Sequence, residues 1–262
     1  MRQGFLFALI LAGVCLLGAA AQSPGEKFYD QALASWEKRG SMDEAKKAAN
    51  LFQQAADADP RNEEYFVRLA IAYYWLGEIT PVEKKKERIE YYTRGEQAAL
   101  KAIALNGQSV GGNFWVVVNN GRVTELKGTL SGSFNFGRCL RCMTTVAVQE
   151  PTYYHGGVYR YWGQFIYEMP SMLRSLAQFT LEDSIYFAKR SAEMEPDFFL
   201  NKLYLAQSYL ANKQREKAKK ELLYVMNASP SVLPGEEPEN RHYQKVAREL
   251  YNKEFGKEKQ RN

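Results

Sequence analysis

The chain has 262 residues, only two histidines and a formal net charge of +5. This length is enough for one large domain. Lysines and arginines are interleaved with glutamates along the chain, which is typical of solvated helix faces and argues against a focused nucleic-acid-binding patch. The sequence has no Walker loop, no G-x-S-x-G and no H-E-x-x-H motif, and we therefore expect no catalytic residues, no cofactor and no metal site.

The first 21 residues have the pattern of a secretory signal peptide. Arg2 supplies a positive charge, an apolar run covers residues 5–17, and small residues follow. The run is shorter than the roughly 20 residues needed to span a membrane. We expect cleavage after Ala21 and a mature domain of residues 22–262. The sequence thus predicts an exported protein.

A lipoprotein signal ending at Cys15 is the alternative interpretation of the same segment. Lipid attachment needs a small residue directly before the cysteine, whereas Val14 occupies that place and the apolar run continues beyond the cysteine. Anchoring at Cys15 is therefore the less favoured interpretation.

Apolar residues recur at helical spacing through most of the remaining chain. Glycines and prolines break this pattern, and Ser41 with Glu44 forms a candidate capping box. Residues 114–118 also fit a strand, but their helical neighbours favour a helix. We expect about nine to eleven helices, over residues 26–38, 41–58, 62–77, 82–105, 113–127 and 139–149, then two pairs within 152–230 with an insertion at 167–178, and a last helix over 241–255.

The segment between Pro196 and Pro230 reads as one tetratricopeptide repeat. These prolines are 34 residues apart, which is the period of that repeat. The first tryptophan position of the pattern holds Lys202, and the other positions are filled as expected by Leu205, Ala206, Tyr209, Ala218 and Leu222. A helical hairpin of this kind cannot bury its apolar face alone, so it stacks on further hairpins and forms a concave surface.

Prolines divide the rest of the chain in the same way. The prolines that end expected helix pairs are Pro60, Pro151, Pro196 and Pro230. Measured back from Pro60, Ala48 and Phe52 occupy the small and aromatic positions of the repeat. Two of the spacings are stretched, so the units are repeat-like and not uniform. We predict an all-α fold of stacked helical hairpins, a tetratricopeptide-repeat-like α-solenoid.

The segment from Pro151 to Pro170 resembles a known family. It reads P-T-Y-Y-H-G-G-V-Y-R-Y-W-G-Q-F-I-Y-E-M-P. Its glycine pair, arginine and final proline are similar to the T-component proteins of TRAP transporters, and the resemblance spans roughly residues 45–230. The residues that carry it are Gly156, Gly157, Arg160, Gly163 and Pro170, with Asn113, Phe114, Trp115 and Asn119 in the preceding helix.

This resemblance implies a fold, a location and a partner. The family is built from helical hairpins related to tetratricopeptide repeats, and its members are periplasmic or lipid-anchored. The implied partner is a periplasmic solute-binding subunit, and the family's oligomers are suggested to hold an apolar ligand in a pore or cleft. The chain departs from the family in lacking a lipobox and in placing Ser171–Arg174 where Gly-Gly-Asp often follows the proline.

Aromatic residues are dense in the same segment. Rings three and four residues apart share a helix face, where they serve either hairpin packing or the lining of a concave ligand site. Arg160 lies among these rings, where it can hold a ligand carboxylate or pair with Glu168 or Glu195 inside the fold. We predict a site for an apolar or carboxylate-bearing ligand from Arg160, Tyr154, Tyr161, Trp162, Trp115 and Asn119.

Cys139 and Cys142 form a C-x-x-C pair, which in an exported protein is either a disulfide, a redox pair or part of the packing. Measured back from Pro151, Cys139 and Met143 occupy the small and aromatic positions of the repeat. No thioredoxin-like pattern surrounds the pair, and zinc would need two further ligands. We expect a packing role and keep a thiol oxidoreductase as the enzymatic alternative.

These features favour an exported, non-enzymatic binding or adaptor protein. The resemblance implies that it works beside a TRAP solute-binding subunit, holds a small apolar ligand and forms a homo-oligomer. A general cell-envelope scaffold for protein assembly has the same fold with a different partner, and it is the alternative function.

Overall fold

The computed structural model describes residues 22–128 and 136–256, and these residues form twelve α-helices and one short 3-10 helix without any β-strand. The all-α prediction is confirmed, with one helix more than the expected upper count. The expected signal peptide and Cys15 lie outside the described residues. The helices are α1 (Pro24–Trp36), α2 (Met42–Ala58), α3 (Glu63–Ile79), α4 (Lys85–Leu105), α5 (Val110–Lys127), α6 (Phe136–Gln149), α7 (Tyr153–Glu168), α8 (Ser171–Leu176), α9 (Leu181–Met194), α10 (Phe199–Ala211), α11 (Arg215–Asn227), the 3-10 helix (Pro230–Val232) and α12 (Glu237–Phe255).

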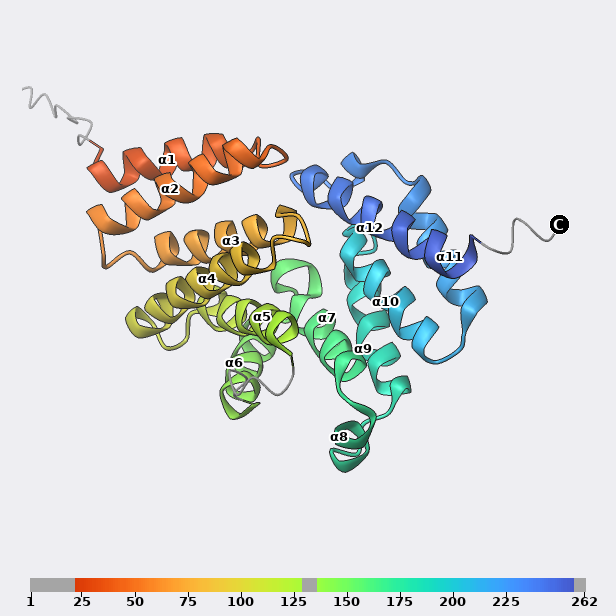
Figure 1. The fold of residues 1–262 in the computed structure, drawn as a ribbon. Helices are drawn as coiled ribbons and strands as arrows, with labels where there is room; N and C mark the ends of the chain where they lie inside the picture. The colour runs from red at the N-terminus through yellow and green to blue at the C-terminus, as the bar shows by residue number, and fades with distance from the viewer. Residues whose placement is uncertain (1–21, 129–135, 257–262) are drawn as a thin grey trace, which may run out of the picture.

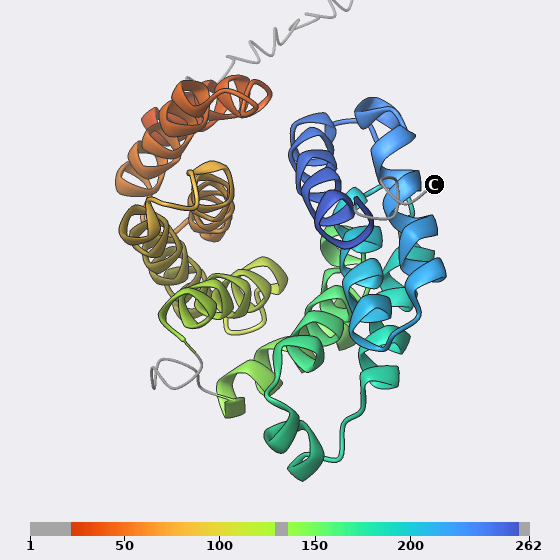
Figure 2. The ribbon, with the colours of Figure 1, turned by 45° about the vertical axis from the view of Figure 1, so that its right-hand side comes forward.

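Helices that follow one another in the chain pack side by side and build two stacks (Figure 1). Helices α1 to α6 form the first stack and α7 to α12 form the second. Helix α7 pairs with α9 because the short α8 projects from the connection between them. The stacks face each other (Figure 2), and they join in the chain where α6 leads into α7.

Each stack has its own apolar core. The first core includes buried residues from Ala32 to Val158, and the second includes those from Ile185 to Phe255. Tyr154 packs against both cores and therefore lies at the junction of the stacks. The repeat positions identified in the sequence are all buried, as expected for the knobs of hairpin packing: Ala48, Phe52, Cys139, Met143, Ala218 and Leu222.

Three details of the helices were not foreseen from the sequence. The insertion at 167–178 contains the additional helix α8. Helix α12 begins at Glu237, because Pro238 stands in its first turn. Backbone N–H groups there have no partner within the helix, so a proline costs no hydrogen bond. Ser41 precedes α2 as its N-cap residue but makes no side-chain cap bond, so the expected capping box does not form.

The two ends of the described chain meet at a buried ion pair. Arg39, after α1, donates from Nε and Nη2 to the two carboxylate oxygens of Glu239 on α12, at 2.6 and 2.7 Å. Arg39 is 3% exposed and Glu239 is 2% exposed. Arg39 also donates to the Gly235 carbonyl, and Trp75 Nε1 donates to the Arg39 carbonyl at 2.8 Å. A two-pronged pair fixes both distance and orientation, so this end contact between Arg39 and Glu239 holds the first hairpin on α12.

Candidate functional site

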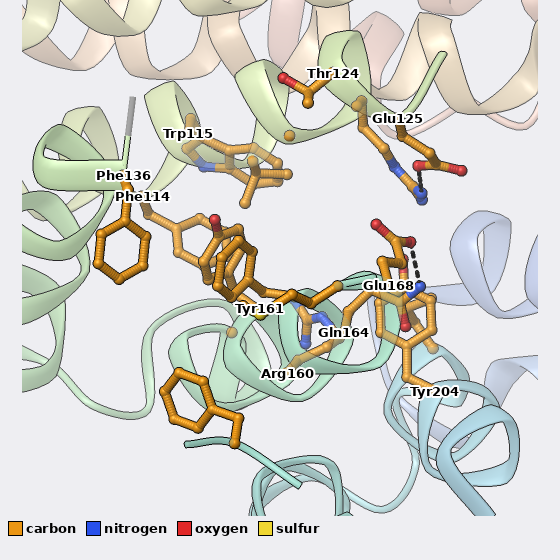
Figure 3. Close-up of a pocket in the computed structure, with 18 of the residues that line it drawn as sticks. Phe114, Trp115, Thr124, Glu125, Phe136, Arg160, Tyr161, Gln164, Glu168 and Tyr204 are labelled. Carbon is orange, nitrogen blue, oxygen red and sulfur yellow. Dashed lines mark hydrogen bonds and ion pairs between the residues drawn. The ribbon is translucent and has the colours of Figure 1, made fainter. Parts of the chain in front are cut away.

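A cavity of about 460 Å³ lies where the two stacks face each other. Its volume falls in the range of small-molecule binding sites. Side chains of α5 form one side, and those of α7, α8 and α10 form the other (Figure 3). Most of the lining is apolar and includes Trp115, Val118, Phe136, Phe165, Leu173 and Phe179.

Helix α7 presents two rows of side chains to the cavity. Tyr161 and Phe165 are four residues apart, as are Arg160, Gln164 and Glu168, and this spacing places each set on one helix face. The ring of Tyr161 stacks with that of Phe165 at a centroid distance of 6.0 Å. The cavity wall on this side is therefore an aromatic row beside a polar row.

Gly157 determines how closely α5 approaches α7. A Cβ atom at this position would lie 2.5 Å from Cζ of Phe114, which no side chain could tolerate without a shift. The absence of a side chain therefore lets the Phe114 ring sit directly against α7. This close approach forms the inner end of the cavity, where the stacks touch.

The start of α7 has a left-handed backbone. Tyr154, His155 and Gly156 have φ values of 46°, 60° and 71°, in a region that residues with side chains seldom occupy. Such strain persists only where the surroundings fix it. Here His155 stacks on Phe198 at 4.4 Å, and its Nε2 lies 3.3 Å from a carboxylate oxygen of Glu236.

Arg160 holds this left-handed turn in place. Its Nη1 donates to Oδ1 of Asn201 at 2.7 Å and to the His155 carbonyl at 3.3 Å, and its Nη2 donates to the Tyr154 carbonyl at 3.1 Å. The residue is 4% exposed, and its guanidinium lies over the rings of Tyr154 and Phe198. Neither Glu168 nor Glu195, the acids considered from the sequence, pairs with it in the described chain. The guanidinium thus ties α7 to α10 through neutral oxygens.

The other end of the polar row is acidic. Glu168 accepts a hydrogen bond from Nε2 of Gln164 at 2.5 Å, and Glu125 stands across the cavity on α5 (Figure 3). Arg122 lies at the same end, where it donates to Glu125 at 2.9 Å and to the buried Glu78 at 3.0 Å. Among the described residues, Arg122 is bound by two carboxylates and Glu168 by none of the basic side chains.

The protein around Glu168 changes its acidity. Its side chain is accessible from the cavity. Removal of surrounding water by the protein, together with the negative charge of Glu125, raises the pKa of Glu168 to about 6. Gln164 and Arg122 act in the opposite direction without cancelling this effect. Glu168 therefore takes up a proton within a pH range that biological compartments reach.

Helix α8 contributes part of the cavity wall. None of its residues is buried, and Met172 and Leu176 are 77% and 80% exposed. Leu173 and Leu176 line the cavity from this helix. Nη1 of Arg174 donates to the carbonyls of Ile166 and Met169 at 3.2 and 3.1 Å, which satisfies the end of α7 and fixes the base of the segment.

The cavity brings together four of the six residues predicted as a ligand site, namely Arg160, Tyr154, Tyr161 and Trp115. Trp162 lies outside the lining, where its ring packs edge-on against Tyr161 and Phe165. Asn119 is fully buried and donates to the carbonyl of Trp115 at 2.9 Å. The sequence interpretation missed Gln164, Arg122, Glu125 and Tyr204, although the spacing of Arg160, Gln164 and Glu168 already indicated a shared face.

The two cysteines have the features of packing residues. Both are free and buried. Sγ of Cys139 lies 2.8 Å from the Tyr161 hydroxyl, and burial raises the pKa of Cys139 to about 11. A thiol with so high a pKa is protonated at neutral pH and is a poor nucleophile. The geometry disfavours the oxidoreductase alternative.

The described residues contain no group of three or more His, Cys, Asp or Glu side chains able to hold a metal ion. None of the described helices combines the length and the apolar character that a membrane span requires.

The family model described as "Regulator of microtubule dynamics protein 1-3" matches residues 31–254. The chain belongs to this family. Its match covers both stacks and all the residues that line the cavity. No curated protein matches the chain.

One solved structure supports the tetratricopeptide-like fold. TTC0263, a thermophilic tetratricopeptide-repeat protein of Thermus thermophilus, is 13% identical and superposes with a TM-score of 0.57 over 86% of this chain and 100% of its own. A crystal structure of MamA is 14% identical, with a TM-score of 0.43 over 88% of this chain and 96% of its own. The first of these confirms the predicted class of helical repeat fold.

Proposed function

We propose that this protein is an exported binding protein that holds an apolar molecule in the cavity between its two stacks. The observation that carries the proposal is the cavity of about 460 Å³, lined by rings and aliphatic side chains with a few polar groups on one side. Such a lining favours binding because it removes the apolar surface of the ligand from water, and its polar groups orient the ligand.

A cavity-filling substitution tests this function directly. Gly121 lines the cavity from within α5, and a Cβ atom there would meet only Cε2 of Tyr161, at 3.9 Å. In Gly121→Leu the new Cβ atom has room, the larger side chain takes space that a ligand would need, and leucine is a better helix former than glycine. The variant is expected to fold while its affinity for the neutral probe dodecanol, measured by calorimetry, falls at least about tenfold.

Gly107→Leu is the matched control, because a Cβ atom at Gly107 has no neighbour within 4 Å and lies away from the cavity. It should bind dodecanol as the natural protein does. Undiminished binding by Gly121→Leu would show that the cavity is not the ligand site. Native mass spectrometry of protein purified gently from its own envelope would then identify any natural ligand by its mass.

We further propose that the protein acts as an adaptor for a TRAP solute-binding subunit in the periplasm. The support is the resemblance of residues 151–170, together with a repeat fold of a kind that commonly binds other proteins. Affinity purification from the native envelope should recover the solute-binding subunit as a stable partner. Recovery of several unrelated envelope proteins in its place would favour the general scaffold.

The family's name refers to microtubule dynamics. A protein exported through the signal peptide expected at residues 1–21 would not meet microtubules. What we carry over from the family is therefore the helical fold. Mass measurement of the purified mature chain checks this reasoning, because cleavage after Ala21 gives a defined mass and an intact N-terminus would remove the argument.

A further inference from the structure

The acidic end of the cavity has an uneven set of charges. Glu168 and Glu125 both line it, and Arg122 is the basic side chain beside them. Arg122 already donates to Glu125 at 2.9 Å and to Glu78 at 3.0 Å. Among the described residues, three carboxylates are therefore gathered around one guanidinium, and Glu168 is the one that this guanidinium does not contact.

Arg160, the second arginine of the cavity, also has its hydrogen-bonding partners inside the fold. Arg160 makes its hydrogen bonds to Asn201 and to two backbone carbonyls, which fix the start of α7. A ligand carboxylate would have to compete with these bonds or use the remaining N–H groups of a side chain that is only 4% exposed. Arg160 therefore has a structural role at the start of α7, and its contacts do not favour recognition of an acidic ligand.

An aromatic ring stands beside the Glu168 carboxylate. Tyr204 of α10 lies at the same end of the cavity as Glu168 (Figure 3), and Tyr74 of α3 also lines the cavity. The faces of such rings attract cations, most strongly where water is excluded. Carboxylates together with ring faces form the chemical environment that suits an ammonium group.

Given that the cavity holds an apolar molecule as proposed above, we infer that this molecule carries a basic amine at one end and that Glu168 binds the ammonium group. The apolar chain of the ligand lies along Tyr161, Phe165 and Trp115. The ammonium group donates to Glu168, and Glu125 adds a second negative charge across the cavity. A long-chain primary amine is the simplest molecule with this chemistry.

Several groups determine how this recognition responds to pH. Arg122 and Glu125 face Glu168 from α5, Gln164 and Tyr167 lie near it on α7, and Tyr204 approaches from α10. Glu125 and loss of water raise the pKa of Glu168 to about 6, against the effects of Gln164 and Arg122. A basic amine stays protonated throughout this range, so binding weakens as the pH falls through 6 and Glu168 becomes neutral.

The test compares three probes of equal chain length by calorimetry at about pH 7.5, namely dodecylamine, dodecanol and dodecanoic acid, each below its solubility limit. Dodecylamine is expected to bind roughly tenfold more tightly than dodecanol, the usual difference for a charge-assisted hydrogen bond. Dodecanoic acid is expected to bind more weakly than dodecanol, because its charge faces Glu168 and Glu125.

Glu168→Gln is the variant that isolates the carboxylate. It keeps the shape of the side chain and removes its charge, so dodecylamine affinity should fall to that of dodecanol and lose its dependence on pH. Dodecanol binding should not change. Glu193→Gln is the matched control, since Glu193 is half-exposed on α9 and away from the cavity.

Each outcome is decisive for one of the two proposals. Preference for dodecanoic acid, or equal binding of all three probes, would overturn recognition of an amine and leave the apolar cavity as the site. Absence of binding by every probe would instead overturn the proposed function. Equal loss of dodecylamine binding in Glu168→Gln and Glu193→Gln would show that the effect is not local.

Discussion

The end contact and the acidic end of the cavity are made of the same groups and differ in how these are paired. Glu239 is buried and receives two hydrogen bonds from Arg39. Glu168 is open to the cavity and receives one from a neutral amide. Pairing inside the fold is what a structural carboxylate requires, because an uncompensated charge is costly to bury. Glu168 is exposed and does not need a cation for the stability of the fold, so its carboxylate is available to the ligand proposed above.

The largest expected effect comes from breaking the end contact. Arg39→Ala leaves Glu239 buried without its cation, and unfolding free energy should fall by about 3–5 kcal/mol, as measured by urea denaturation. Arg68→Ala is the control, because the Arg68–Glu64 pair is 39% and 48% exposed and such a pair contributes at most about 1 kcal/mol. Equal losses in the two variants would contradict the structural role assigned to the buried pair.

Two helix caps give the same comparison on a smaller scale. The Thr180 hydroxyl accepts from the Asp183 N–H at 3.2 Å in a complete capping box before α9, whereas Ser41 makes no cap bond before α2. Thr180→Ala should therefore lower the unfolding free energy by about 1 kcal/mol. Ser41→Ala should change it by much less, and a larger loss for Ser41→Ala in thermal unfolding would reverse this assignment.

The smallest effect is expected at Glu168, and its sign is opposite. The folded-state pKa of Glu168 is raised to about 6, from 4.5, so the folded protein binds its proton more tightly and is destabilised as the pH rises between these values. Because the side chain is open to water, Glu168→Gln should stabilise the empty protein at about pH 8 by only about 0.5–1 kcal/mol. The gain should disappear below pH 4.5, which urea denaturation at both pH values would show.

The helical fold was predictable because its signal is local and repeated. Small and aromatic residues at fixed distances before Pro60 and Pro230 indicated the buried face of each hairpin, and these residues are buried. Helix α8 could not be recognised because it buries none of its side chains and so lacks an apolar face. The capping box predicted at Ser41 does not form. The residue pattern allows such a hydrogen bond, but it does not fix the side-chain geometry that the bond needs.

The cavity was only partly predictable. Rings and an arginine within residues 153–165 indicated one wall, since residues close in sequence share one helix face. The opposite wall comes from α5, and Tyr204 comes from α10. The start of α7, between these walls, turns left-handed at Tyr154 and His155. Residues with side chains seldom adopt that backbone, so no propensity predicts it. The residue pattern also left Arg160 a choice of acids, whereas its partner is Asn201.

The separation of Arg39 and Glu239 along the chain has a consequence for folding kinetics. A linear repeat array depends on neighbouring units and can grow from any of them. The end contact joins residues 200 positions apart, so we expect it to form after the two stacks, because closing so long a loop is entropically costly. An interaction formed after the transition state slows unfolding without accelerating folding. We therefore expect the end contact to lengthen the lifetime of the native protein and to leave its folding rate unchanged.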